Sequence, residues 1–199
     1  MRHTQLIVGL VSALLLALAC SGGGDEKGAT PTPPARGGTS SATTRTGAQP
    51  LTVQAWAQRV CAISQRFSDE VAAIGDQVDR ESLTLEQRKE RISRISPQFI
   101  AAAKKAANDM ASVEPPTAAR SFHDALYRNL QDLAAAQAEA QRRYGQATTV
   151  QQLDATNEAL INTITLSGQR VQLAAGRLTP AILDALRGIA SCGSLRFDS

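Results

Sequence analysis

Residues 51–78 read LTVQAWAQRVCAISQRFSDEVAAIGDQV, and the spacing of their apolar side chains decides the fold class. The apolar side chains recur every third or fourth residue, at Val53, Trp56, Val60, Ile63, Phe67, Val71, Ile74 and Val78. These steps place them on one face of an α-helix, whereas a strand would alternate with a period of two. Thr52 is the expected N-cap, because a threonine hydroxyl accepts a free backbone N–H of the first turn. We therefore expect an amphipathic helix with one buried face.

Similar spacing continues through two further segments. The second segment opens at Thr84 with Gln87 three residues later, which is the pattern of a capping box. Pro97 falls inside this segment, and a proline removes a backbone donor and clashes with the preceding turn. The segment is therefore either one kinked helix or two shorter helices. The prolines at 115–116 separate it from a third helix, which we expect Gly145 to close.

A fourth apolar segment begins at Thr149 and contains Thr179 followed by Pro180. This dipeptide indicates either a kink or a separate last helix over about residues 180–191, because proline is well tolerated at the first helical position. No segment alternates with period two, and no Asn-Gly or Asp-Gly hairpin signal occurs. The sequence thus predicts an all-α body over residues 51–199. Four long helices with short links favour an antiparallel up-down four-helix bundle.

The start of the chain has the plan of a secretory signal peptide. Arg2 precedes the uncharged residues 6–19, LIVGLVSALLLALA, which end in small residues before Cys20. As a helix, these fourteen residues rise about 21 Å, well short of the roughly 30 Å hydrocarbon core, which disfavours an uncleaved spanning anchor. We therefore expect residues 1–19 to be a signal peptide.

Two cleavage patterns meet at Cys20. Residues 16–20, LALAC, resemble the lipobox of bacterial lipoprotein precursors, with Ala17 where that motif usually has leucine. The resemblance implies that Cys20 receives a diacylglycerol, becomes the new N-terminus and is usually acylated again on its amine. Two or three acyl chains anchor a protein stably, whereas one is marginal. Ordinary secretion is the alternative, because Ala17-Leu18-Ala19 also fits the A-x-A rule.

Residues 21–50 predict a tether. They are rich in Gly, Pro, Ser and Thr, and none of their apolar side chains is larger than alanine. Such a segment cannot bury enough surface to offset its ordering entropy, so we expect a disordered linker. A flexible coil of this length has a root-mean-square reach of about 30 Å. Residues 20–50 would then connect the body to the extracytoplasmic face of the cell membrane.

The cysteine count agrees with lipidation. The chain has three cysteines, so a lipid on Cys20 leaves the even pair Cys61 and Cys192. Cys61 lies in the opening turns of the first helix and Cys192 at the end of the last, and an even number of passes brings these places to the same end of a bundle. Disulfides persist in exported proteins. We predict a Cys61–Cys192 disulfide, and the alternative for Cys61 is a small buried hydrophobe.

The sequence indicates neither an enzyme nor a nucleic-acid binder. It contains no G-x-S-x-G elbow, P-loop, dinucleotide fingerprint, H-E-x-x-H or EF-hand loop. The formal charge of +3 is too balanced to indicate a nucleic-acid partner. With His123 as the one histidine beyond Cys20, we expect no metal site and no cofactor. We expect a non-enzymatic protein that binds an envelope protein or polymer or has a structural role, and a hydrolase without a recognised motif is a further alternative.

His123 and Tyr127 are the candidate ligand-binding pair, because residues four apart share a helix face. With the polar interruptions Thr163 and Ser167, they would line a site between helices in the alternative function, the sensing or capture of a ligand. The blander expectation is that His123 is exposed to solvent or makes one hydrogen bond. A Cys192 thiol with His123 as its base is chemically feasible, but disulfide pairing competes with it.

A basic run follows the start of the second segment, where acidic residues are interspersed. We expect it to be a solvated helix face, and contact with anionic phospholipid or cell-wall polymer is the competing interpretation. The basic residues are Arg88, Lys89, Arg91 and Arg94, with Lys104 and Lys105 beyond them.

Overall fold

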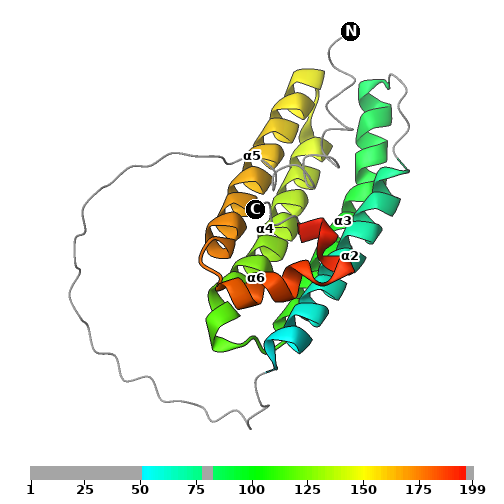
Figure 1. The fold of residues 1–199 in the computed structure, drawn as a ribbon. Coiled ribbons are helices and arrows are strands. Elements are labelled where there is room, and N and C mark those ends of the chain that lie inside the picture. Colours follow the sequence, from blue (N-terminus) through cyan, green and yellow to red (C-terminus); the bar gives the residue numbers. More distant parts are fainter. Residues whose placement is uncertain (1–50, 78–82, 196–199) are drawn as a thin grey trace, which may run out of the picture.

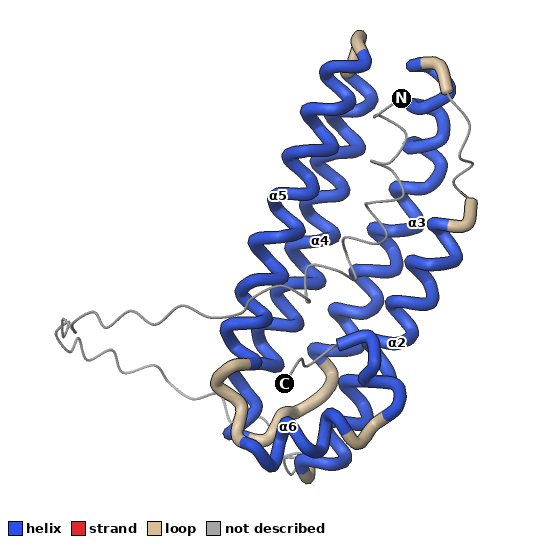
Figure 2. Tube along the Cα trace, turned by 45° about the horizontal axis from the view of Figure 1, so that its top comes forward, coloured by secondary structure: helices blue, strands red, loops and turns tan. Residues whose placement is uncertain are grey.

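The computed structural model describes residues 51–77 and 83–195, and this part of the chain is helical (Figure 1). The described part contains no strand, so the all-α prediction is confirmed for it (Figure 2). The predicted signal peptide, Cys20, the tether and Val78 lie outside the described residues. The α-helices are α2 (Val53–Gly75), α3 (Leu85–Ala111), α4 (Arg120–Gln146), α5 (Val150–Ala175) and the short α6 (Pro180–Arg187), and two 3₁₀ helices are η1 (Thr117–Ala119) and η2 (Ala190–Leu195).

Threonine caps begin three of the long helices, and the caps at Thr52 and Thr84 are those that the sequence predicts. The hydroxyls of Thr52, Thr84 and Thr149 each accept the backbone N–H three residues later. At Thr84 the capping box is complete, because the side chain of Gln87 also accepts the Thr84 backbone N–H at 2.9 Å. Gly145 lies inside the last turn of α4 and not after it, so that helix ends slightly later than predicted.

Pro97 and Pro180, each of which the sequence allows as a kink or as a boundary between helices, have different places in the structure. The helix α3 runs through Pro97 without a break, and the Pro97 ring is exposed. The missing N–H costs a hydrogen bond to the Ser93 carbonyl, but Ser93 is also exposed, so water reaches this side of the helix. Pro180 instead occupies the first turn of a separate helix, α6, which ends at Arg187, earlier than predicted. The first proline is therefore tolerated inside a helix, and the second one starts a helix.

The long helices pack in chain order. The helix α4 contacts α3 and α5, and α2 contacts α3. The helices α2 and α5 make no extended contact with each other, although a closed ring of four helices would require them to pack together. At one end of the long helices, α6 and η2 follow α5 and contact α2 (Figure 1). The described helices therefore form a row whose outer members are connected at that end.

The core differs in character from helix to helix. The apolar stripe of α2 is buried as predicted, except that Val53 and Ile74 are only partly covered. Apart from Met110, the helix α3 buries small residues, and its side chains Ile92, Ile95 and Phe99 are half-buried. Alanine at a helix contact lets two helices approach closely. The buried alanines of α3 are Ala102, Ala103, Ala106 and Ala107.

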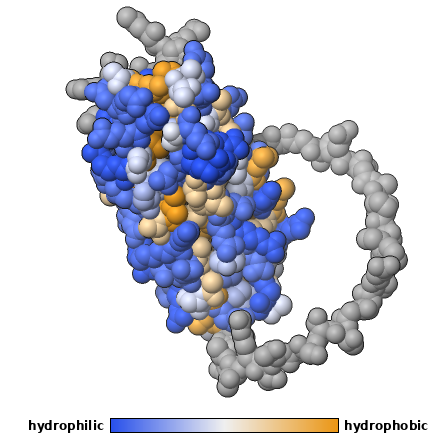
Figure 3. Space-filling view, turned by 180° about the vertical axis from the view of Figure 1, so that it is seen from behind, coloured by the Kyte–Doolittle hydropathy of each residue, from blue (hydrophilic) through white to orange (hydrophobic). Residues whose placement is uncertain are grey.

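The face of the molecule in Figure 3 is mainly hydrophilic, with apolar residues along its middle and at its edges. The largest exposed apolar side chains belong to α5, where Leu166 is 57% exposed and Leu173 is 69% exposed. These two leucines are seven residues apart and therefore share one side of the helix. The residues that α5 buries, such as Ile164 and Val171, lie on another side.

Candidate functional site

The structure pairs Cys61 with Cys192 as a disulfide, which is the pairing that the sequence predicts. The two Cα atoms are 4.7 Å apart, and both side chains are buried. The bond joins α2 to η2 and spans a sequence separation of 131 residues. In the chain-entropy model, closing a loop of this length stabilises a fold by about 5 kcal/mol. Because Cys192 is bonded to Cys61, it has no free thiol. A nucleophilic Cys192 with His123 as its base would require one.

His123 lies at a junction of three helices. The indole Nε1–H of Trp56 in α2 donates to Nδ1 of His123 in α4 at 3.3 Å. The imidazole also hydrogen-bonds the backbone of Met110 at the end of α3. Trp56 is fully buried and His123 is 4% exposed. The expectation that His123 is exposed to solvent is therefore wrong, because the side chain is buried against Trp56.

Electrostatics keep the His123 imidazole neutral at pH 7. Burial lowers its pKa most, and the nearby positive charge of Arg120 acts in the same direction. The carboxylates of Asp124 and Glu114 and the hydrogen bond to Met110 raise the pKa, but burial prevails. Since Nδ1 accepts a hydrogen bond, the proton of the neutral ring is on Nε2.

The other residues of the predicted ligand site do not converge on this junction. Tyr127 is half-buried, and its hydroxyl accepts a hydrogen bond from Gln131 at 2.7 Å. Thr163 is exposed and donates back to a carbonyl of its own helix at 3.0 Å. Ser167 is buried and donates to Asp132 of α4 at 3.2 Å. Each of these side chains thus has a separate local partner.

Two polar contacts between helices, one buried and one partly buried, were not predicted. Gln137 of α4 donates to the hydroxyl of Ser96 in α3 at 2.9 Å, and both side chains are buried. The hydroxyl of Tyr144 in α4 is hydrogen-bonded to Asn157 in α5. Burial, assisted by the negative charge of Asp154, raises the pKa of Tyr144. A glutamine within an apolar stripe was the available signal, because a buried amide requires a polar partner.

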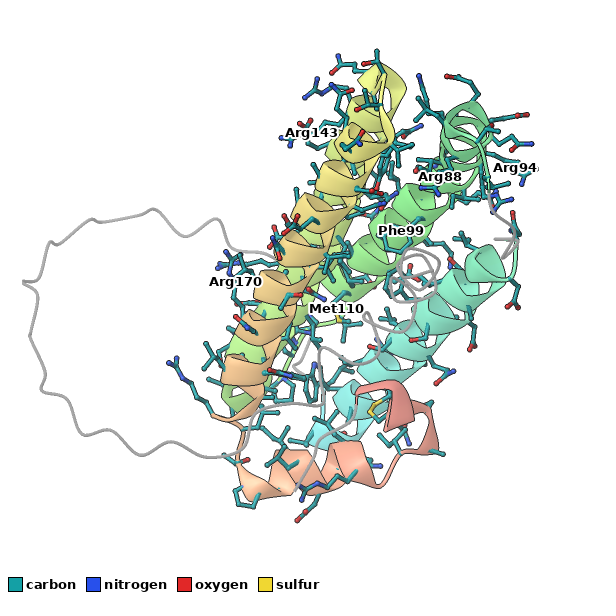
Figure 4. All side chains as sticks on the ribbon, turned by 90° about the horizontal axis from the view of Figure 1, so that it is seen from above. Arg88, Arg94, Phe99, Met110, Arg143 and Arg170 are labelled. Atoms are coloured by element: carbon teal, nitrogen blue, oxygen red, sulfur yellow. A yellow bond between two sulfur atoms is a disulfide. The ribbon has the colours of Figure 1, made fainter. Side chains whose placement is uncertain are left out.

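The charged side chains form ion pairs on the surface. Glu139 binds both Arg142 and Arg143, at 2.6 Å and 2.7 Å, and their hydrogen bonds lower its pKa to about 2. In the predicted basic run, Lys89 donates to the Ala147 carbonyl at 3.0 Å. Figure 4 shows Arg88 and Arg94 on α3 and Arg143 on α4, extending outward from their helices. Arg94, Lys104 and Lys105 are exposed, as expected for a solvated face, whereas Arg88, Lys89 and Arg91 are half-buried.

Within residues 51–77 and 83–195, no group of three or more histidine, cysteine, aspartate and glutamate side chains is placed to hold a metal ion. None of the helices in these ranges combines the length and the apolar character needed to cross a membrane. Comparison with known proteins gives no relative, because no protein family, curated protein or solved structure matches the chain.

Proposed function

We propose that the protein is anchored by lipid to the extracytoplasmic face of the cell membrane, where it binds a partner in the envelope without catalysing a reaction. The observation that carries this proposal is the pairing of Cys61 with Cys192. It leaves Cys20 as the one cysteine of the three that has no partner in the body, and Cys20 ends the lipobox-like sequence. A structural disulfide is also typical of an oxidising compartment outside the cytoplasm.

The proposed body is an antiparallel up-down bundle of the four long helices. Each of these helices packs against the next one in the chain, and only residues 147–149 connect α4 to α5. So short a connection favours antiparallel neighbours. The covalent link at Cys61 supports the proposal, because it ties the start of the first long helix to the chain that follows the last one.

The proposed action is binding through the surface of a tethered body. A linker of 30 residues lets the body sample a layer about 30 Å deep above the membrane. Within the body, the candidate ligand-binding side chains each have a hydrogen-bond partner in the protein itself. They are His123, Tyr127, Thr163 and Ser167. This pairing supports a stable scaffold more than a reactive site. The proposed partner is a protein or polymer of the cell envelope.

Metabolic labelling tests the anchor. Cells that produce the protein are grown with an alkyne fatty acid, and the protein is then conjugated to a fluorophore. We expect labelling of the wild type and of the matched control Ser21→Ala, and no labelling of Cys20→Ser. Equal labelling of Cys20→Ser, or no labelling of the wild type, contradicts the anchor.

Crosslinking in intact cells tests the binding role. We expect the same envelope protein or polymer to be crosslinked to the wild type in repeated experiments. Deletion of residues 21–50 should reduce that crosslink, because the body then loses its reach from the membrane. If no partner recurs with the wild type, the binding role is wrong even when the lipid anchor is present.

A further inference from the structure

The junction around Trp56 holds the first turns of α2 against the rest of the body. The Trp56 ring meets Phe122 of α4 edge to face, with ring centroids 6.4 Å apart, and lies 6.5 Å from the His123 ring. Trp56 has no exposed surface, so water does not reach its indole N–H. The indole therefore depends on His123 as its acceptor, and the hydrogen bond joins two helices that are far apart in sequence.

This hydrogen bond requires a neutral imidazole. Neutral histidine offers one nitrogen as an acceptor, whereas protonated histidine carries an N–H on both nitrogens. Because Nδ1 accepts the indole N–H, the proton of the neutral ring is on Nε2, and an added proton goes to Nδ1, where it faces the indole N–H. Two donors then oppose each other in a place that excludes water. A buried charge and an unpaired buried donor both cost free energy, so the contact cannot persist in this form.

We infer that the contact of Trp56 with His123 is an acid-sensitive latch, in which protonation of His123 releases the first turns of α2 from α4. The latch is closed at neutral pH and opens in mildly acidic surroundings. The latch is independent of the proposed binding role and of the lipid anchor, because it rests only on the contacts around Trp56 and His123.

The charged groups around the imidazole help to set the pH at which the latch opens. Asp124 and Arg120 act on His123 from its own helix, and Glu114 acts from the segment between α3 and η1. Glu114 is itself paired with Arg120 at 2.7 Å, so the two charges partly offset each other. The other helices contribute Trp56 and the Met110 carbonyl, neither of which titrates in this range.

The direction of the pH effect follows from the lowered pKa of His123 in the folded state. Above the ordinary value of 6.5, the histidine is neutral in both the folded and the unfolded chain, so it adds no pH dependence. Below that value, the unfolded or opened form takes up the proton first. Stability of the junction therefore falls as the pH decreases from 6.5 towards the lowered pKa.

The disulfide limits how far α2 can open. Cys61 follows Trp56 by five residues and is bonded to Cys192. Protonation therefore frees the turns of α2 before Cys61, while the remainder of the helix stays joined to η2. These freed turns directly follow residue 50, where the predicted tether meets the body. Acid would thus change the connection between tether and body without unfolding the body.

The experiment uses the fact that Trp56 is the only tryptophan in the chain. The full chain is labelled with ¹⁵N, and its single indole N–H signal is followed by NMR from pH 7.5 to pH 5. We expect the indole proton to be protected from solvent exchange at pH 7.5 and to exchange freely as His123 titrates. Amide signals of α5 should stay unchanged over the same range. An indole proton that stays protected after His123 has titrated overturns the latch.

The matched variant is His123→Gln, because a glutamine oxygen accepts the indole hydrogen bond and does not titrate in this range. We expect its indole proton to stay protected down to pH 5. If this variant opens at the same pH as the wild type, His123 is not the sensor and the inference is wrong.

The tautomer of His123 is a second measurement that needs no stable variant. Long-range ¹⁵N–¹H spectra of the wild type should show Nε2–H and an unprotonated Nδ1 at pH 7.5. The other histidine, His3, is assigned with the variant His3→Gln. A neutral His123 with its proton on Nδ1 contradicts the inference, because that nitrogen could not accept from Trp56.

Discussion

At the scale of single residues, buried polar pairs specify which helices meet and in which register. Gln137 and Ser96 are both buried and bind each other across α3 and α4. A buried polar group without a partner costs about 1–3 kcal/mol. A relative shift of the two helices by one turn would leave both groups unpaired, so this pair favours the observed register over nearby alternatives.

Replacing Gln137 with alanine tests this role. We expect Gln137→Ala to lower the free energy of unfolding by about 1–3 kcal/mol, because the Ser96 hydroxyl loses its partner. Urea denaturation provides the measurement, and exposed Gln151→Ala is the control, expected within about 0.5 kcal/mol of the wild type. Equal effects of the two substitutions would show that the buried pair adds nothing to stability.

The surface cluster around Glu139 predicts a pH effect of the same sign as that of His123, but in a more acidic range. The arginine contacts lower the pKa of Glu139 to about 2, so its stabilising contribution is complete above the ordinary value of 4.5 and is lost as the pH falls towards 2. Carboxyl ¹³C shifts should give a midpoint near 2 in the wild type and a higher one in Arg142→Gln. An unchanged midpoint in Arg142→Gln would mean that this arginine does not set the pKa.

At the scale of elements, helix α3 shows that packing against neighbouring helices can offset the free-energy cost of a proline inside a helix. The helix α3 continues through Pro97 although proline in a helix interior costs about 3 kcal/mol. It packs against α2 and α4, and these contacts hold the helix together on both sides of the proline. The same residue type at Pro180 costs little, because the first turn of a helix lacks N–H partners in any case.

The two prolines form a matched pair for experiment. We expect Pro97→Ala to raise the free energy of unfolding by about 1–3 kcal/mol, since it restores a helical hydrogen bond. Pro180→Ala should change it by less than about 1 kcal/mol. Thermal denaturation followed by circular dichroism distinguishes the two variants. A destabilising Pro97→Ala would mean that the proline itself contributes to the packing of α3.

Features of these helices were predictable from the sequence when the interacting residues lie close together in the chain. Thr52, Thr84 and Thr149 cap helices with bonds to residues three positions away, so the sequence contains both partners of each bond. The junction of Trp56 and His123 joins residues 67 positions apart, and no periodicity indicates that they meet. Likewise, an apolar stripe predicts that a helix face is buried but does not say which helix covers it. The lack of extended contact between α2 and α5 was therefore not predictable.

At the scale of the whole molecule, one covalent bond connects the ends of the row of helices. The disulfide, α6 and η2 together join the chain after α5 to α2, which α5 itself does not contact extensively. The buried residues Ile182 and Leu186 of α6 add apolar contacts at the same end. This closure keeps α2 from separating freely from the C-terminal segment.

Removing the disulfide should weaken that closure. We expect the double variant Cys61→Ala, Cys192→Ala to lose about 2–5 kcal/mol of unfolding free energy. Hydrogen exchange should increase first in α6 and η2. Adding a reductant should lower the melting temperature of the wild type and leave that of the variant unchanged. If the variant melts like the oxidised wild type, the bond does not stabilise the body.

The most direct test of the account is the intact mass of the protein purified from the cells that make it, under non-reducing conditions. We predict a chain that begins at Cys20, carries the added mass of a diacylglycerol and fatty acid, and lacks two hydrogens relative to free Cys61 and Cys192. An unmodified N-terminus, or a mass that shows both thiols free, would contradict the account.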